Sequence, residues 1–145
     1  MTSFKFFLAL IILSLLGLFD ASYLTFKHYA GLPMSCSLLQ GCEKVLTSQY
    51  AVIGGLPVAL LGVGYYLAIF VVSASSFRYP SAKTLVLIRL LSPFGFLGSL
   101  WFVYLQLFVL KAICLYCLIS AVTSTLIFIF SFIALKEGSF RKGRG

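Results

Sequence analysis

Long apolar blocks separated by short polar stretches dominate this chain. The apolar segments cover about residues 6–26, 56–74, 84–110 and 112–135. A helix of about 20 apolar residues is long enough to cross the hydrocarbon core of a bilayer. The pattern therefore predicts an all-α membrane protein, a four-transmembrane-helix bundle that forms a single integral membrane domain over residues 1–145.

The longest polar stretch between these segments is residues 27–53, which we expect to lie over one end of the bundle. After Gly41, the run 42–48 has the composition of a short surface helix, with Val45 and Leu46 resting on the membrane. The sequence therefore predicts an outer capping loop that contains a short helix.

Prolines and glycines are expected to modify the helices. Pro57 is expected in the first turn of the second helix, where its missing N–H costs nothing, and Pro93 predicts a kink in the third. Small residues allow close packing of membrane helices. We interpret the following glycines in this way: Gly62, Gly64, Gly95 and Gly98.

Composition supports a membrane protein over a soluble one. Hydrophobic residues make up 61% of the chain and charged residues only 10%, against about 25% charged in soluble domains. The net charge of +8 would also suit a nucleic-acid-binding protein. Here, however, the basic residues lie between the apolar segments and in the tail, so they indicate membrane topology.

The basic residues predict the orientation, because cytoplasmic loops are enriched in Lys and Arg. Lys27, Lys44 and Lys111 fall on one side of the membrane. The other side carries Lys5, Arg78, Lys83, Arg89, Lys136, Arg141, Lys142 and Arg144. We expect the second side to be cytoplasmic, with both termini there. A cleaved signal peptide is the alternative, but no clean cleavage site follows the first apolar segment.

Two cysteines open the last apolar segment as Cys114-Leu115-Tyr116-Cys117. Positions three apart lie on one face of a helix, and a helix N-terminus favours a thiolate. The spacing therefore suits a pair that cycles between dithiol and disulfide. The predicted topology also places Cys36 and Cys42 on the outer side, where disulfides persist.

Two other interpretations of the four cysteines remain open. They would suit structural disulfides, although a Cys-x-x-Cys bridge closes almost no loop and gains little stability. They would also suit a Cys₄ zinc site, although the oxidising compartment argues against it. Of the remaining polar residues, His28 is interpreted as interfacial, Asp20 as a charge in the outer headgroup region, and Arg89 as a snorkelling cation.

Several motifs resemble one known family. They are Cys36-Ser-Leu-Leu-Gln-Gly-Cys42, Ser48 six residues on, Gly55-Leu56-Pro57, the Cys114–Cys117 motif, and the run from Asp20 to Leu24. Together they cover nearly the whole chain and resemble the bacterial or archaeal homologues of vitamin K epoxide reductase.

The resemblance implies a quinone-dependent thiol-disulfide oxidoreductase in a bacterial or archaeal cell (inner) membrane, with a redox-active centre that generates disulfides. A thioredoxin-like partner would pass electrons to Cys36, Cys42 would pass them to Cys114, and Cys117 would face a quinone such as ubiquinone or menaquinone. Ser48 matches the hydroxyl position near the quinone. No metal is implied.

Some features depart from the family. No fused thioredoxin-like domain is seen, so we expect a separate partner on the outer side. Ala121 stands where vertebrate members have Tyr, which favours disulfide formation over epoxide reduction. The alternatives are a DsbB-type protein, in which the two cysteine pairs come in the opposite order, and a non-enzymatic membrane protein with structural disulfides.

Overall fold

Four long helices form the body of the computed structural model, which describes residues 2–33, 41–79 and 81–142. These helices are α1 (Thr2–Ala30), α3 (Val58–Arg78), α4 (Ala82–Tyr104) and α5 (Leu115–Lys142). Each is long and apolar enough to cross a membrane, which confirms the predicted all-α four-helix bundle. The chain is an integral membrane protein.

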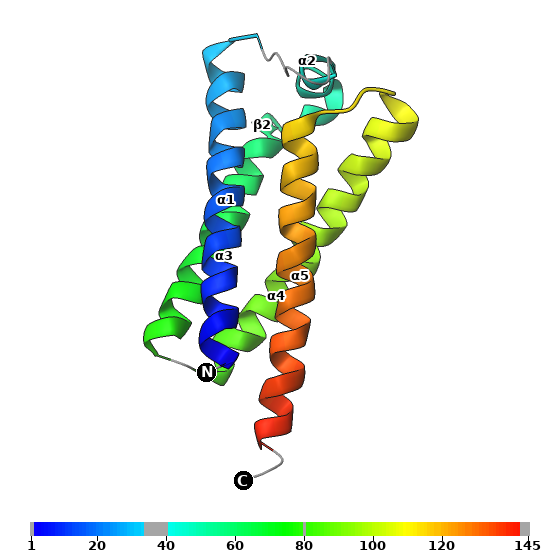
Figure 1. Ribbon diagram of the computed structural model, residues 1–145. Helices are drawn as coiled ribbons and strands as arrows, with labels where there is room; N and C mark the ends of the chain where they lie inside the picture. The colour runs from blue at the N-terminus through cyan, green and yellow to red at the C-terminus, as the bar shows by residue number, and fades with distance from the viewer. Residues whose placement is uncertain (1, 34–40, 80, 143–145) are drawn as a thin grey trace.

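The helices pack in the ring order α1, α3, α4, α5, with α5 returning to α1. Figure 1 shows that α1 begins and α5 ends at one end of the bundle, while the short helix α2 (Cys42–Leu46) lies at the other. The apolar residues that face outward are exposed in the absence of lipid. These side chains form the surface that contacts the lipid tails of a bilayer.

The first helix continues to Ala30, beyond the expected end at residue 26. Lys27 and His28 occupy its last turn, where cations interact favourably with the negative end of the helix dipole. The Lys27 ammonium also lies 5.6 Å from the centre of the Tyr23 ring. Basic residues thus extend the helix past its apolar segment.

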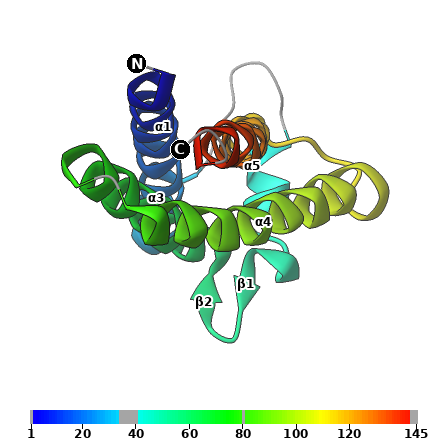
Figure 2. The ribbon, with the colours of Figure 1, turned by 90° about the horizontal axis from the view of Figure 1, so that it is seen from below.

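The capping loop contains more structure than the sequence predicted. α2 confirms the short helix, and it is followed by the 3₁₀ turn η1 (Gln49–Ala51) and the antiparallel strands β1 (Val52–Ile53) and β2 (Leu56–Pro57). Gly54 and Gly55 join the strands with φ of +59° and +85°, the left-handed backbone of a tight two-residue hairpin turn. Figure 2 shows this hairpin projecting beside α4.

The predicted position of Pro57 was wrong by one residue. Pro57 has extended backbone (φ −64°, ψ 138°) and precedes α3, which begins at Val58. Pairing with Val52 across the hairpin holds it in the strand. Pro93 does lie inside α4. The Ser92 hydroxyl donates to the Arg89 carbonyl at 3.4 Å, the group that the missing Pro93 N–H leaves without its helical donor.

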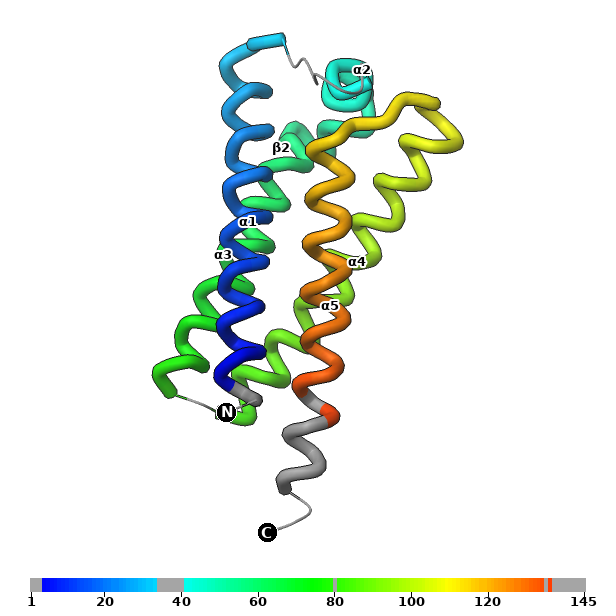
Figure 3. Tube along the Cα trace, in the orientation of Figure 1, coloured from blue at the N-terminus to red at the C-terminus, as the bar shows by residue number. Residues whose placement is uncertain are grey.

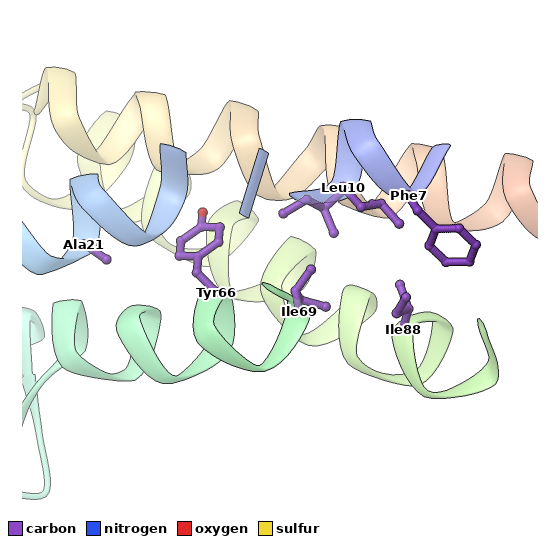
Figure 4. Packing of buried hydrophobic residues seen from close by; sticks show 7 residues of the cluster. Phe7, Leu10, Ala21, Tyr66, Ile69 and Ile88 are labelled. Atoms are coloured by element: carbon purple, nitrogen blue, oxygen red, sulfur yellow. The ribbon is translucent and has the colours of Figure 1, made fainter. Parts of the chain in front are cut away.

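Polar contacts between helices accompany a mainly apolar interior. The residues labelled in Figure 4 pack between α1, α3 and α4, with Tyr66 between Ala21 and the others. The Tyr66 hydroxyl reaches α5, where it donates to the Ser120 carbonyl at 2.8 Å. The Ser92 and Ser131 hydroxyls lie 2.8 Å apart between α4 and α5. Such hydrogen bonds help membrane helices to associate, because lipid tails supply no hydrophobic drive between helices.

Only some glycines serve helix packing as expected. A Cβ at Gly95 would overlap the Tyr65 ring, and one at Gly62 would lie 3.4 Å from Ala21 Cβ. The prediction was wrong for Gly64 and Gly98, which have open space at that position. The sequence analysis also missed Gly17, where a Cβ would overlap the ring of the buried Tyr66.

We predict that Gly17→Ala destabilises the bundle, because the added methyl displaces a Tyr66 ring that is held by Ser120. Overpacking of this kind costs about 1–3 kcal/mol. Gly64→Ala is the matched control, since it adds the same methyl to a membrane helix without a contact. Thermal unfolding in detergent should show a lower Tm for Gly17→Ala than for Gly64→Ala. Equal Tm values would contradict the packing argument.

Candidate active site

Cys114 and Cys117 begin helix α5. The main-chain carbonyl of Cys114 accepts a hydrogen bond from the N–H of Leu118 at 3.1 Å, so Cys114 is the N-terminal cap of the helix. Its Sγ accepts from the N–H of Cys117 at 3.4 Å, as a capping side chain does. The two free thiols therefore lie one helical turn apart, with the first sulfur over the N–H groups of the second.

This position lowers the pKa of the Cys114 thiol. A hydrogen bond from the Cys117 thiol is the main cause that lowers the pKa of Cys114. The N–H groups of Cys117 and Tyr116 also lower it, while burial and the charge of Asp20 act in the opposite direction. A lowered pKa favours the thiolate, which is the reactive form in disulfide exchange.

The outer loop meets Cys114 through Cys42. Both side chains are fully buried, and they belong to one apolar cluster with Leu24 and Val45. Cys42 is disulfide-bonded, whereas Cys36 lies outside the described residues. The structure thus brings one cysteine of the loop to the start of α5.

Gly41 permits this approach because it has no side chain, and not because its backbone conformation is unusual. Its φ of −90° and ψ of −9° are ordinary helical values. A Cβ at Gly41, however, would lie 2.5 Å from the carbonyl oxygen and 2.6 Å from the nitrogen of Ile113. Only a residue without a side chain allows the loop backbone to pack against the connection that leads to Cys114.

Cys117 faces a different environment. It lies on the wall of a partly open cavity of about 590 Å³ that is lined by the four long helices and the cap. Further wall residues are Ala21, Leu24, Val45, Leu46, Leu61, Phe94, Leu97, Trp101, Phe102 and Ala121. A cavity of this size and apolar character, with a few polar groups, suits a small hydrophobic ligand.

The polar groups on this wall come from several elements. They include His28 at the end of α1, Tyr65 of α3, and Ser120 and Ser124 of α5. His28 therefore belongs to the cavity wall, a position that the interfacial interpretation did not foresee. The hydroxyl of Tyr65 is buried without a hydrogen-bond partner among the described residues, so the wall retains an unused polar group.

Ser48 and Asp20 lie apart from that wall. The Ser48 hydroxyl donates to the Val45 carbonyl at 2.7 Å and is not among the cavity residues; its role at a quinone stays a prediction. Asp20 lies inside α1, which continues to Ala30, and its interpretation as a charge in the headgroup region stays a prediction. One of its carboxylate oxygens is buried without a partner in the described part of the chain.

The sequence analysis missed Gln106. This residue is almost fully buried, and its Oε1 accepts a hydrogen bond from the main-chain N–H of Cys114 at 2.9 Å. Its Nε2 is buried with no acceptor among the described residues, which costs about 1–3 kcal/mol for such a group. A lone amide in an apolar segment, eight residues before Cys114, was the available signal.

Comparison with known proteins places this arrangement in a family. The family model described as "Vitamin K epoxide reductase family" matches residues 8–132, a range that includes all four cysteines, the whole of α3 and α4, and the larger part of α1 and α5. No curated protein matches the chain.

We predict that Cys117→Ala raises the pKa of Cys114, because it removes the hydrogen bond that contributes most to lowering it. The thiolate of Cys114 should then appear at higher pH. The test uses protein in which Cys36→Ser and Cys42→Ser leave only the membrane pair, with thiolate absorbance followed against pH. Cys117→Ser, which keeps a hydroxyl donor, should shift the midpoint less. An unchanged or lower midpoint in Cys117→Ala would contradict the assignment.

Proposed function

The chain belongs to the vitamin K epoxide reductase family, and from this premise we propose that it generates disulfides in a thioredoxin-like partner and delivers the electrons to a membrane quinone. Membership makes it a membrane oxidoreductase of the quinone-linked thiol type. The proposal adds the electron path, the partner and the cellular setting. Ubiquinone, menaquinone or a similar quinone would be the acceptor.

One observation carries the proposal. Cys114 is buried against Cys42 under the cap, while Cys117, one turn along the same helix, lines the cavity. A protein partner cannot enter the bilayer, and a hydrophobic quinone does not leave it. A pair of thiols that lies against both the cap and the cavity can carry electrons from a protein partner to a quinone.

The partner dithiol first reduces the outer Cys36–Cys42 disulfide and becomes a disulfide itself. Two further thiol–disulfide exchanges and one oxidation then return the chain to its starting state. Cys42, as a thiolate, attacks Cys114 in the Cys114–Cys117 disulfide, and Cys117 leaves as a thiolate. Cys36 then attacks Cys42, re-forming the outer disulfide and releasing Cys114. The Cys114/Cys117 dithiol returns to the disulfide as two electrons and two protons pass to the quinone, the terminal oxidant that draws the exchange forward.

The redox states of the described cysteines support this path. Cys42 is disulfide-bonded, while Cys114 and Cys117 are free thiols. The proposed path passes through a state of this kind, in which Cys42 is in a disulfide and the membrane pair carries the electrons.

The cavity residues fit a quinone. The apolar wall matches a substituted ring and the start of a prenyl tail, and polar side chains such as His28, Tyr65 and Ser120 supply possible partners for ring oxygens. Ala121 leaves the position next to Ser120 without a hydroxyl. The bound quinone would supply the two-electron oxidation, and the chain would hold it beside Cys117.

The partner and the orientation follow from the charges at the two ends. The start of α1 and the α3–α4 connection, near Lys5, Arg78 and Lys83, lie at the end of the bundle opposite to α2. We propose that this basic end is cytoplasmic, as are both termini. A separate thioredoxin-like protein would then meet Cys36 from the outer side of a bacterial or archaeal cell membrane.

The roles of the two pairs can be separated with a small dithiol such as dithiothreitol, which we expect to reduce the membrane pair directly. Cys114→Ser and Cys117→Ser should abolish quinone reduction by this dithiol. Cys36→Ser and Cys42→Ser should retain it but lose oxidation of a thioredoxin-like protein. Spectrophotometric quinone reduction by the purified variants measures both arms. If Cys42→Ser loses dithiol-driven activity as completely as Cys117→Ser, the two-stage path is wrong.

The orientation is tested in cells with single cysteines placed in a variant whose four native cysteines are Ser. Lys44→Cys lies in α2 and Ser81→Cys in the connection before α4, and both positions are exposed. A membrane-impermeant thiol reagent should label Lys44→Cys in intact cells and Ser81→Cys only after the membrane is opened. The opposite labelling would reverse the proposed topology.

A further inference from the structure

The connection between α4 and α5 carries the membrane cysteine pair without being helical itself. Figure 3 shows it running from the end of η2 (Leu105–Val109) to the start of α5, and the Gly41 contact places Ile113 beside the cap. Lys111 in this connection has a positive φ of 50°. Backbone of this kind is tolerated at membrane depth only when protein groups satisfy it.

Gln106 provides two hydrogen-bond acceptors for this connection. Its main-chain carbonyl accepts from the N–H of Ala112 at 3.1 Å, and its side-chain Oε1 accepts from the N–H of Cys114 at 2.9 Å. The second bond fixes the residue that caps α5 and carries the thiolate. One side chain therefore links the end of one membrane helix to the main chain of the cysteine that begins the next.

The local helix geometry brings Gln106 to this place. η2 is a π-helical turn, with the Leu110 N–H bonded to the Leu105 carbonyl at 2.7 Å. Leu105 and Gln106 are both buried there, while Leu107, Phe108 and Val109 are exposed. Single π-helical turns inside helices are frequent at functional sites.

We propose that Gln106 is a positioning residue for the thiol exchange, which holds Cys114 where Cys42 reaches it. The inference rests on the proposed function, since it concerns the exchange between these two cysteines. The amide oxygen suits the role, because it is a strong acceptor for the Cys114 N–H.

The Nε2 atom, which has no acceptor among the described residues, indicates that Gln106 does more than fill space. A buried donor without an acceptor is costly, and an apolar side chain of similar length would remove that cost. It would also remove the acceptor for Cys114. Oε1 accepts a hydrogen bond, whereas Nε2 has no acceptor among the described residues. The oxygen is therefore the group of this amide that holds Cys114.

The wild-type protein gives the first test and avoids any question of folding. Hydrogen–deuterium exchange with fragmentation should show a protected amide at Cys114, although Cys114 precedes the helix. The exposed residue Lys111 in the same connection should exchange faster. An unprotected Cys114 amide would overturn the proposal, because the hydrogen bond to Gln106 would then be absent.

The second test measures the exchange without a quinone. In Cys117→Ala protein with an oxidised outer pair, the Cys114 thiolate attacks the Cys42 sulfur, forms a Cys42–Cys114 bond and releases the Cys36 thiolate. No external oxidant is needed, and no thiol remains at 117 to resolve the bond. Mass spectrometry of non-reduced peptides gives the rate at which this bond forms.

Two substitutions at Gln106 then distinguish positioning from packing. Gln106→Met fills the space but lacks the acceptor, and it should slow formation of the Cys42–Cys114 bond on the order of tenfold to a hundredfold. Gln106→Glu keeps an acceptor oxygen and should slow it less than Gln106→Met. A purely structural role predicts the reverse order, because a buried carboxylate disturbs the fold more than a thioether does.

Gln49→Met is the control, since Gln49 is exposed in η1, and it should match the Cys117→Ala parent. All rates are divided by the folded fraction from protease resistance. If Gln106→Met forms the bond as fast as the parent, or faster than Gln106→Glu, Gln106 does not position Cys114. Because no readout involves a quinone, failure of quinone reduction would refute the proposed function and leave this test intact.

Discussion

The requirement that backbone polar groups be satisfied inside a bilayer governs this structure. It accounts for four long helices with little irregular backbone between them at membrane depth. The exception is the connection from Leu110 to Cys114, and here Gln106 and the packed loop replace the missing helical partners. The least regular part of the bundle is thus the part that carries the reactive thiols.

A single turn of helix separates two chemical environments. Cys114 lies at the helix N-terminus with donors around its sulfur, beneath the cap. Cys117 lies against the apolar cavity. A helix N-terminus stabilises a thiolate, and an apolar cavity admits a hydrophobic oxidant. The Cys-x-x-Cys spacing therefore places the two sulfurs in different surroundings, one under the cap and one at the cavity.

Apolar blocks were enough to predict the four helices, because segment length depends on local sequence. The hairpin was also encoded locally, by Gly54-Gly55, but its strands are too short to show a pattern. Gln106 and Gly17 were not predictable, since their importance depends on Cys114 and Tyr66, which are distant in the chain or lie on another helix. The end of the first helix was placed too early because its basic last turn prolongs the helix past the apolar segment.

The contact between Gly41 and Ile113 joins main chain to main chain. Such a contact does not depend on the side chain of residue 113, but it excludes any side chain at residue 41. The loop and the connection before α5 can therefore differ in most of their side chains and still meet at this contact. Loops of altered composition would still seat on the same helix start, provided that a glycine precedes the second loop cysteine.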